Sequence, residues 1–149
     1  MIRVGQYVGI IAREMGIGDA TSRTLRLAAL LHDVGKIGIS DTIFLKPSKF
    51  TDEEYDLMKK HCDYGHSICD PVSGEKSPAM SPRTMLAARI LRGATAPLLQ
   101  AAGAIALTHH EKWDGSGYPH RLSGEDIPIE GRITAVADVF DVLSSKRPY

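Results

Sequence analysis

Apolar residues recur along most of the chain at intervals of three and four, which is the spacing of an amphipathic helix. In the first such segment the apolar face is formed by Val4, Val8, Ile11 and Met15. On this basis helices are predicted at residues 3–15, 19–34, 52–61, 82–93, 96–110 and 132–145. Alternating patterns typical of strands are few and no internal repeat is present, so the sequence predicts an all-α fold.

Turn-forming residues divide these helices. Thr51 and Glu54 have the spacing of a capping box, which marks the start of the third helix. Residues 35–50 and 115–131 lack a helical period and are rich in glycine and proline, so they are predicted to be irregular. Residues 71–81 (PVSGEKSPAMS) have the composition of a flexible linker.

A histidine and an aspartate are adjacent at the end of the second predicted helix. His32 shares its helix face with apolar residues, and for a lone histidine a place in the core near a helix C-terminus is the simpler explanation. Asp33 follows directly, however, and Lys36 lies just beyond. A buried charge costs several kcal/mol unless it is paired or bound to a metal, so this group indicates a functional site.

Two further histidines, His109 and His110, stand side by side at the end of the fifth predicted helix. Each shares its helix face with apolar or small residues, so both are predicted to point toward the core. Neighbouring residues on a helix diverge by about 100°. Two rings that diverge in this way bind two nearby metal ions more readily than they bind a single ion. The pair therefore indicates a site with several metals.

The last predicted helix has two contrasting faces. Its polar face consists of Thr134, Asp138, Asp141 and Ser145. Its apolar face consists of Ile133, Val136, Phe140 and Leu143. Periodicity alone allows the polar face to point to water, but it lacks the long charged side chains usual on exposed helices. We therefore favour a buried, metal-binding role for Asp138.

His61, at the predicted end of the third helix, is the last candidate metal ligand. Together the candidate ligands come from four predicted helices, and they are His32, Asp33, His61, His109, His110 and Asp138. Imidazole with carboxylate suits iron, manganese or zinc. The remaining histidines, His66 and His120, have no such neighbours in the sequence and are predicted to be surface residues.

The composition narrows the classes of function. The chain has 149 residues, with 18 Lys and Arg against 18 Asp and Glu, so no net charge attracts nucleic acid. No apolar run has the length of a membrane span, and charges interrupt the N-terminal segment where a signal peptide would be apolar. Cys62 and Cys69 form no disulfide framework. A cytoplasmic protein without a nucleic-acid partner is expected.

Several common active-site motifs are excluded because the sequence does not match them. The segment HHEKWD is not the zinc-protease motif HExxH, because position 114 is Asp. GSGYP is not the dinucleotide-binding GxGxxG, and neither a P-loop nor a nucleophile elbow is present.

Three segments together resemble the HD-GYP family of bacterial phosphodiesterases: LLHDVGKIGI, HHEKWDGSGYP and ADVFDVLSSKRPY. The second is similar to the family signature HHExxDGxGYP over its full length. The resemblance implies an all-helical HD-type domain over residues 1–149, with a multi-metal site between helices. It also implies hydrolysis of cyclic di-GMP, a bacterial second messenger, with two or three divalent metal ions, commonly iron or manganese.

The resemblance also implies roles for individual residues. The six candidate ligands would bind the metals, and Asp33 would be the bridge between two of them. Lys36 would contact the scissile phosphate or assist the leaving group, so Asp33 and Lys36 are the predicted catalytic residues. The predicted substrate-binding residues are Lys36, Gly117, Tyr118, Pro119, Asp141 and Arg147. The glycines of the GYP loop would let it close over a nucleotide.

The chain departs from the family pattern in three places. Family members carry another ligand histidine just ahead of the position of Met1, and further helices after the position of Tyr149. We therefore expect a fragment truncated at both ends. Residues 69–84 resemble an insertion. The family also implies a sensor or receiver domain ahead of this one and GGDEF-domain proteins as candidate partners.

Two other functions stay open at this point. The chain could be a signalling module that binds nucleotide or a partner protein through the GYP loop without turnover. It could also be another HD-type nucleotide phosphohydrolase, although the complete GYP signature disfavours this.

Overall fold

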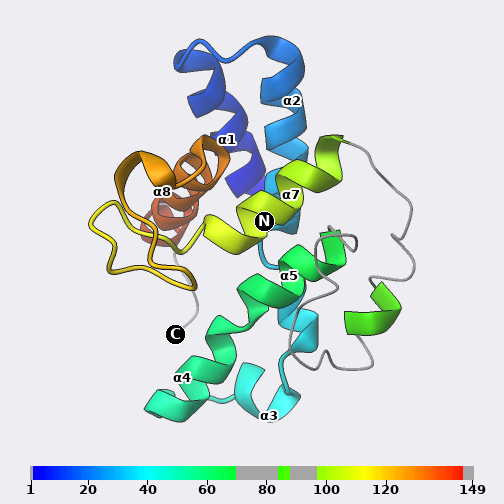
Figure 1. The fold of residues 1–149 in the computed structure, drawn as a ribbon, viewed down its shortest axis with the longest axis vertical. Coiled ribbons are helices and arrows are strands. Elements are labelled where there is room, and N and C mark those ends of the chain that lie inside the picture. Colours follow the sequence, from blue (N-terminus) through cyan, green and yellow to red (C-terminus); the bar gives the residue numbers. More distant parts are fainter. Residues whose placement is uncertain (1, 70–83, 88–96, 146–149) are drawn as a thin grey trace.

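The structure is a computed structural model that describes residues 2–69, 84–87 and 97–145. Within these ranges every regular element is a helix, which confirms the all-α prediction (Figure 1). The α-helices are α1 (Ile2–Glu14), α2 (Asp19–Ala28), α3 (Asp41–Phe44), α4 (Asp52–Lys59), α5 (His61–Cys69), α7 (Pro97–Thr108) and α8 (Ile129–Ser144). Three 3₁₀ turns are η1 (Ala29–Leu31), η2 (Val34–Gly38) and η4 (Gly124–Asp126). Nearly all of the predicted linker and insertion, and most of the predicted helix at 82–93, lie outside the described residues.

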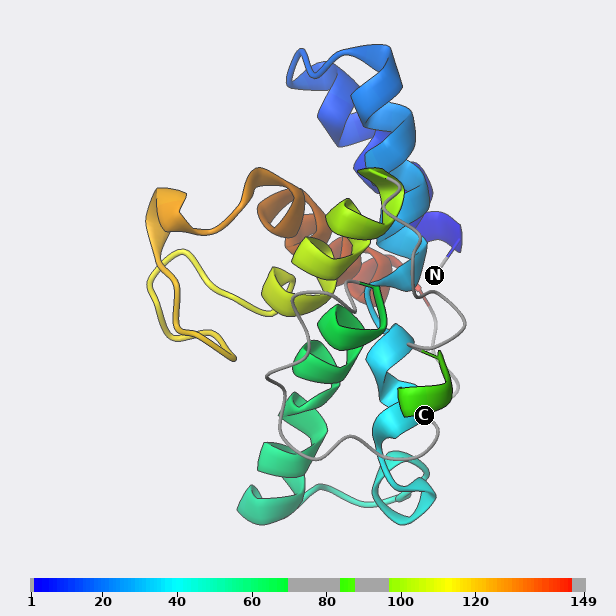
Figure 2. The same ribbon diagram turned by 45° about the vertical axis from the view of Figure 1, so that its right-hand side comes forward.

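Helix α7 lies at the centre of the fold. It packs against α2, α5 and α8, while α1 packs against α2 and α8. Helices α1 and α2 form an antiparallel pair at one end, and α4 and α5 extend to the other (Figures 1 and 2). The core between them is built from small and β-branched residues, which are Val4, Val8, Ala12, Ala28, Ala102, Ile105, Ile133 and Ala137. No described helix combines the length and the apolar character needed to cross a bilayer.

Helix α1 follows its prediction except at its end. Val4 and Val8 are fully buried, as predicted. Met15 is 54% exposed, so its assignment to the buried face is wrong. The reason is that the helix ends at Glu14, and Ala12 occupies the last core position instead.

Helix α2 is shorter than predicted. It ends at Ala28, and the chain tightens into η1 and then η2, so His32 and Asp33 lie in the turn between two 3₁₀ segments. The prediction of one helix over 19–34 is therefore wrong at its C-terminal end. The tighter path places η2 against α5. It depends on Gly35, where an added Cβ would lie 1.9 Å from the carbonyl oxygen of His61.

The segment from 51 to 69 contains one helix that the sequence predicted and a second that it did not. The predicted capping box is confirmed: Thr51 Oγ1 accepts from Glu54 N at 3.3 Å, and Glu54 Oε2 accepts from Thr51 N at 2.8 Å. Helix α4 then ends at Lys59, and α5 begins at His61. The prediction that His61 ends a helix is wrong, because His61 opens the next one and is nearly fully buried there.

Helix α8 turns its polar face inward. Thr134 is fully buried and Asp141 is 6% exposed, while Val136, Phe140 and Leu143 of the predicted apolar face are 61%, 54% and 80% exposed. Ile133, the fourth member of that face, is buried in the core. The inward orientation of the polar face agrees with the interpretation favoured from the sequence. It brings Asp138 toward the residues contributed by the other helices.

The contact at Gly35 generates a test of the fold. We expect Gly35→Ala to lower the free energy of unfolding by about 2 kcal/mol or more, because the new methyl group would collide with backbone atoms of α5 rather than with a flexible side chain. Gly18→Ala is the control, since nothing lies within 4 Å of its added Cβ, and it should cost less than about 1 kcal/mol. Urea unfolding of both variants makes the comparison, and equal losses of stability would contradict the proposed packing.

Candidate metal centre

Four side chains converge where η2, the start of α5 and the end of α7 meet. Ligand-type atoms of Asp33, His61, His109 and His110 all lie within 4.8 Å of one another. Asp33 reaches the group from the turn before η2, His61 from the first position of α5, and the other two from the residues directly after α7. The predicted doublet of histidines therefore contributes to one cluster.

Asp33 lies at the centre of this cluster. Its Oδ1 lies 3.5 Å from His61 Nε2 and 3.9 Å from His109 Nε2. Its Oδ2 lies 3.5 Å from His32 Nε2 and accepts a hydrogen bond from Lys36 Nζ at 2.6 Å. The two carboxylate oxygens thus face different imidazoles, which is the arrangement a shared metal-bridging carboxylate requires.

Asp138 joins the cluster from α8. Its Oδ1 lies 3.9 Å from His32 Nε2, and its side chain is 29% exposed. All six residues proposed as ligands from the sequence therefore lie in one continuous group of contacts. They come from four separate parts of the fold, so packing of the helices is what assembles them.

The orientation of three histidines is set by their backbone contacts. Nδ1 of His32 lies 2.7 Å from the carbonyl oxygen of Ala29, and Nδ1 of His61 lies 2.7 Å from that of Met58. Nδ1 of His109 lies 3.0 Å from the carbonyl oxygen of Ile105. A carbonyl oxygen only accepts, so each Nδ1 must carry the proton and each neutral ring presents an Nε2 lone pair. Metal-binding histidines are held in this way.

Two buried atoms in the cluster have no hydrogen-bond partner among the described residues. They are Asp33 Oδ1 and His109 Nε2. A buried acceptor without a partner costs about 1–3 kcal/mol, so such atoms in a folded protein call for an explanation. A divalent cation satisfies both, and the set of imidazole nitrogens and carboxylate oxygens suits iron, manganese or zinc. The residues present therefore fit a metal centre.

The protonation states also favour a cation. Burial lowers the pKa of His61, and burial together with its neighbour His110 lowers the pKa of His109 well below the ordinary value. Burial and the nearby His61 lower the pKa of His110 to about 4. Burial opposes ionisation of Asp33, but the Lys36 ammonium together with His32 and His109 outweighs it, so the pKa of the carboxyl lies below its usual value. Neutral imidazoles around an ionised carboxylate are the forms that bind metals.

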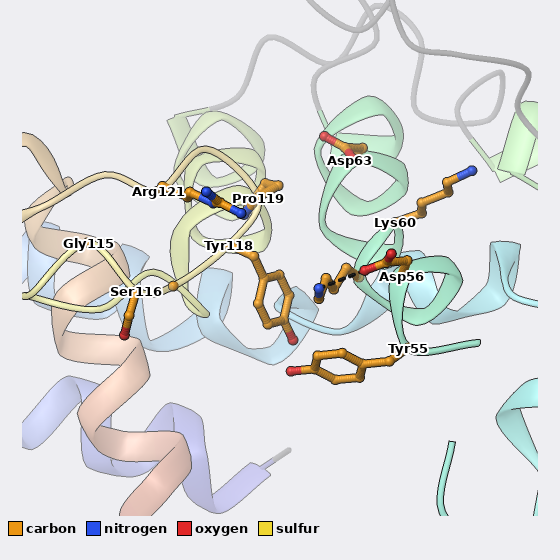
Figure 3. Close-up of a pocket in the computed structure, with 11 residues that line it drawn as sticks. Tyr55, Asp56, Lys60, Asp63, Gly115, Ser116, Tyr118, Pro119 and Arg121 are labelled. Atoms are coloured by element: carbon orange, nitrogen blue, oxygen red, sulfur yellow. Dashed lines mark hydrogen bonds and ion pairs between the residues drawn. The ribbon is translucent and has the colours of Figure 1, made fainter. Parts of the chain in front are cut away.

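The GYP loop is held against this centre by Tyr118. The Tyr118 ring stacks on His110 with centroids 4.7 Å apart and planes 25° apart. Its other neighbours are Tyr55, at 6.2 Å between ring centroids, and Lys59, whose Nζ lies 5.9 Å from the Tyr118 ring. Burial raises the pKa of the Tyr118 phenol, so it stays protonated. Tyr118 and Pro119 also line a cavity of about 630 Å³ (Figure 3).

The predicted freedom of this loop does not agree with its contacts. Gly117 is buried, and a Cβ there would lie 2.4 Å from the backbone nitrogen of Lys112. The buried Glu111 carboxylate accepts backbone N–H bonds from His120 at 2.7 Å and from Leu122 at 3.1 Å. The interpretation of the glycines as a source of flexibility is wrong for Gly117, because its role is to let two backbone segments touch.

The remaining predicted substrate residues lie apart from the cluster or outside the described part of the chain. Asp141 is buried and its Oδ1 lies 2.9 Å from Arg3 Nε, so α8 is tied to α1 there. Arg147 lies outside the described residues. Sequence reasoning missed three residues, namely Glu111, Tyr55 and Lys59. Glu111 stands inside the quoted motif and could have been found there, whereas Tyr55 and Lys59 carry no local signal because only the fold brings α4 to the loop.

Comparison with known proteins finds a matching family and several relatives. Residues 70–149 match a protein-family model described as an HD domain. The chain is 46% identical to a cyclic di-GMP phosphodiesterase of Thermotoga maritima, covering 99% of this chain and 34% of that protein. It is 44% identical to the 3'3'-cGAMP-specific phosphodiesterase 2 of Vibrio cholerae, covering 99% and 24%. It is 41% identical to the cyclic di-GMP phosphodiesterase response regulator RpfG of Xanthomonas campestris, covering 99% and 33%. The chain thus spans about a third or less of the length of these relatives.

Metal content tests the central position of Asp33. Protein prepared without oxygen should retain iron, manganese or zinc, and Asp33→Ala should reduce the bound metal to roughly a tenth of an equivalent or less, because it removes the carboxylate that faces three histidines. Elemental analysis measures this. Asp126→Ala, which removes an exposed carboxylate from η4, is the control. Equal losses in the two variants would show that Asp33 is not the shared ligand.

Acid sensitivity tests the neutral histidines. A histidine whose folded-state pKa is lowered gives stability above its unfolded pKa of about 6.5 that is lost as the pH falls. For His110, with a folded-state pKa of about 4, the loss extends from about pH 6.5 to about pH 4. The free energy of unfolding of the metal-free protein should therefore fall on acidification more steeply than that of His110→Gln, by about 1.4 kcal/mol per pH unit. Urea titrations across this window measure both slopes, and parallel profiles would contradict the lowered pKa.

Proposed function

This chain belongs to the HD domain family, and we propose that it is a metal-dependent phosphodiesterase that hydrolyses cyclic di-GMP. The observation that carries the proposal is the convergence of four imidazoles on Asp33, with three rings fixed so that Nε2 faces the cluster. The full HHEKWDGSGYP signature supports the HD-GYP type of this family.

The names of the relatives support the class of substrate. Two of the three relatives described above are named for cyclic di-GMP and one for 3'3'-cGAMP, at 46%, 41% and 44% identity. Both compounds are cyclic dinucleotides that contain guanine and two phosphodiester bonds. Cyclic di-GMP is the proposed substrate, and 3'3'-cGAMP is the comparison compound in any assay.

The six clustered residues would hold two or three divalent ions, for which iron or manganese is proposed. The ions would supply Lewis acidity to the phosphate and a water that ionises near neutral pH. The chain's own contribution is to fix the ligands. Asp33 faces His61 and His109 with one oxygen and His32 with the other, as suits a carboxylate shared between ions. The backbone carbonyl bonds keep the rings from turning away.

Lys36 is proposed to hold the scissile phosphate. Its ammonium lies 2.6 Å from Asp33 Oδ2, and its side chain is 32% exposed, so it borders both the cluster and solvent. A phosphate at the cluster would bring a second anion within reach of this cation. Lys36 would then stabilise the negative charge that develops on the phosphate and on the departing oxygen.

The GYP loop and α8 are proposed to complete the substrate site. Tyr118, with Gly117 and Pro119 beside it, would bound the nucleotide next to His110. Asp141 and Arg147 stay predictions as substrate contacts. A GGDEF-domain partner, a sensor or receiver domain in a longer chain, and a cytoplasmic location also stay predictions.

Turnover tests the function and the role of Lys36 together. Protein loaded with manganese or with iron under exclusion of oxygen should hydrolyse cyclic di-GMP, followed by chromatography. Lys36→Met should lower kcat about a hundredfold, since it removes charge stabilisation at the phosphate, with metal content unchanged. Lys49→Met, which removes an exposed lysine remote in sequence from the motifs, should keep wild-type kcat. Binding of cyclic di-GMP without turnover by any loaded form would favour the non-catalytic signalling module instead.

A further inference from the structure

A cavity of about 630 Å³ lies beside the metal centre and has no part in it. It opens between the α4–α5 region and the GYP loop (Figure 3), and the described residues that line it include none of the six ligands. Its size is within the range of about 300–1,000 Å³ that is usual for small-molecule sites. The side chains of its walls indicate which part of a ligand it would bind.

One wall of the cavity is aromatic. Tyr118 stacks on His110 at 4.7 Å and meets Tyr55 edge to face at 6.2 Å, so one ring of the cavity wall is in contact with the cluster. Tyr55 is 45% exposed, and Lys59 Nζ lies 4.6 Å from its ring centroid. An exposed aromatic ring beside a nucleotide-cleaving centre offers a stacking surface for a base.

The other walls carry charges of both signs. Asp56 is engaged by Lys59 at 2.7 Å, which fixes that lysine along the cavity wall. Asp63 approaches from α5, and Arg121 approaches from the loop beside Pro119, as Figure 3 shows. A carboxylate accepts hydrogen bonds and a guanidinium donates them. A flat ring with donors along one edge and acceptors along another is the chemical complement of this pair.

We propose that this cavity binds one guanine base of the substrate, an inference that rests on the proposed phosphodiesterase function. Asp63 accepts from the N1–H and N2–H groups of guanine. Arg121 donates to O6 and N7, which are the acceptors that arginine reads in guanine elsewhere. Tyr55 supplies the stacking surface. Adenine lacks the N2 amine and carries a donor in place of O6, so the cavity discriminates against it.

The inference is tested first by binding, without any need for turnover. Metal-free protein is titrated with GMP, IMP and AMP by calorimetry. IMP differs from GMP only by the missing N2 amine, so wild-type protein should bind GMP about tenfold more tightly than IMP. In Asp63→Asn this preference should disappear. The control is Glu53→Gln, an exposed carboxylate on α4 that does not line the cavity and that should leave the preference intact.

The stacking surface has a test of its own. Tyr55→Leu should weaken GMP binding about tenfold, while Tyr55→Phe should restore it, because the ring is kept and the hydroxyl is lost. Circular dichroism of both variants checks that the fold is intact. Equal binding of GMP and IMP by the wild type, or an unchanged preference in Asp63→Asn, overturns the assignment.

Kinetics separate this inference from the proposed function. With cyclic di-GMP, Asp63→Asn should raise KM about tenfold and leave kcat within about twofold. Turnover of bis(p-nitrophenyl) phosphate, which carries no base, should be unchanged in this variant. A wild-type protein that prefers GMP but cleaves neither substrate would refute the phosphodiesterase and keep the guanine site. A wild-type protein that cleaves both, with an unchanged KM in Asp63→Asn, would refute the guanine site alone.

Discussion

Hydrogen bonds from Nδ1 to main-chain carbonyl oxygens fix the orientation of three imidazole rings in this protein. The arrangement of the candidate metal centre depends on these bonds. Each carbonyl belongs to a residue three or four positions earlier in the chain, so a local turn fixes each ring. The opposite nitrogen of each ring then points inward, where Asp33 stands. Burying four histidines around one carboxylate without a cation would cost free energy, because polar groups lose their water on burial. A divalent cation held by these residues would offset that cost.

Backbone contacts at two glycines bring these turns together. Gly35 lets η2 touch the His61 end of α5, and Gly117 lets the GYP loop fold back on the residues after α7. Glu111 then holds the returning chain through two backbone N–H groups. The result is that Tyr118 stacks on His110 of the cluster and also lines the cavity. The loop thus connects the ligand cluster to the cavity.

The sequence predicted the parts of this arrangement that have a local signature. These are the features set by residues close together in the sequence, namely the Thr51 capping box, the apolar spacing of α1 and the residue order of the histidine motifs. Helix α5 was missed, because the predicted helix stopped at His61, whereas Lys60 keeps helical backbone angles and the chain continues directly into α5. The early end of α2 was missed because apolar residues continue past Ala28 as far as Val34. For α8, periodicity defined two faces, but only the packing of α1 and α7 decides that the polar one is buried.

We expect His32, His61 and His109 to be oriented as metal ligands before any metal binds. Long-range proton–nitrogen correlation NMR of the metal-free, nitrogen-15-labelled protein at about pH 8, where free imidazole is neutral, observes the tautomers directly. The Nδ1–carbonyl hydrogen bonds predict a protonated Nδ1 and an unprotonated Nε2 in all three rings. Only the Nε2 signals should shift strongly when zinc is added. Rings protonated at Nε2, or tautomers that exchange freely and settle only on addition of zinc, would contradict it.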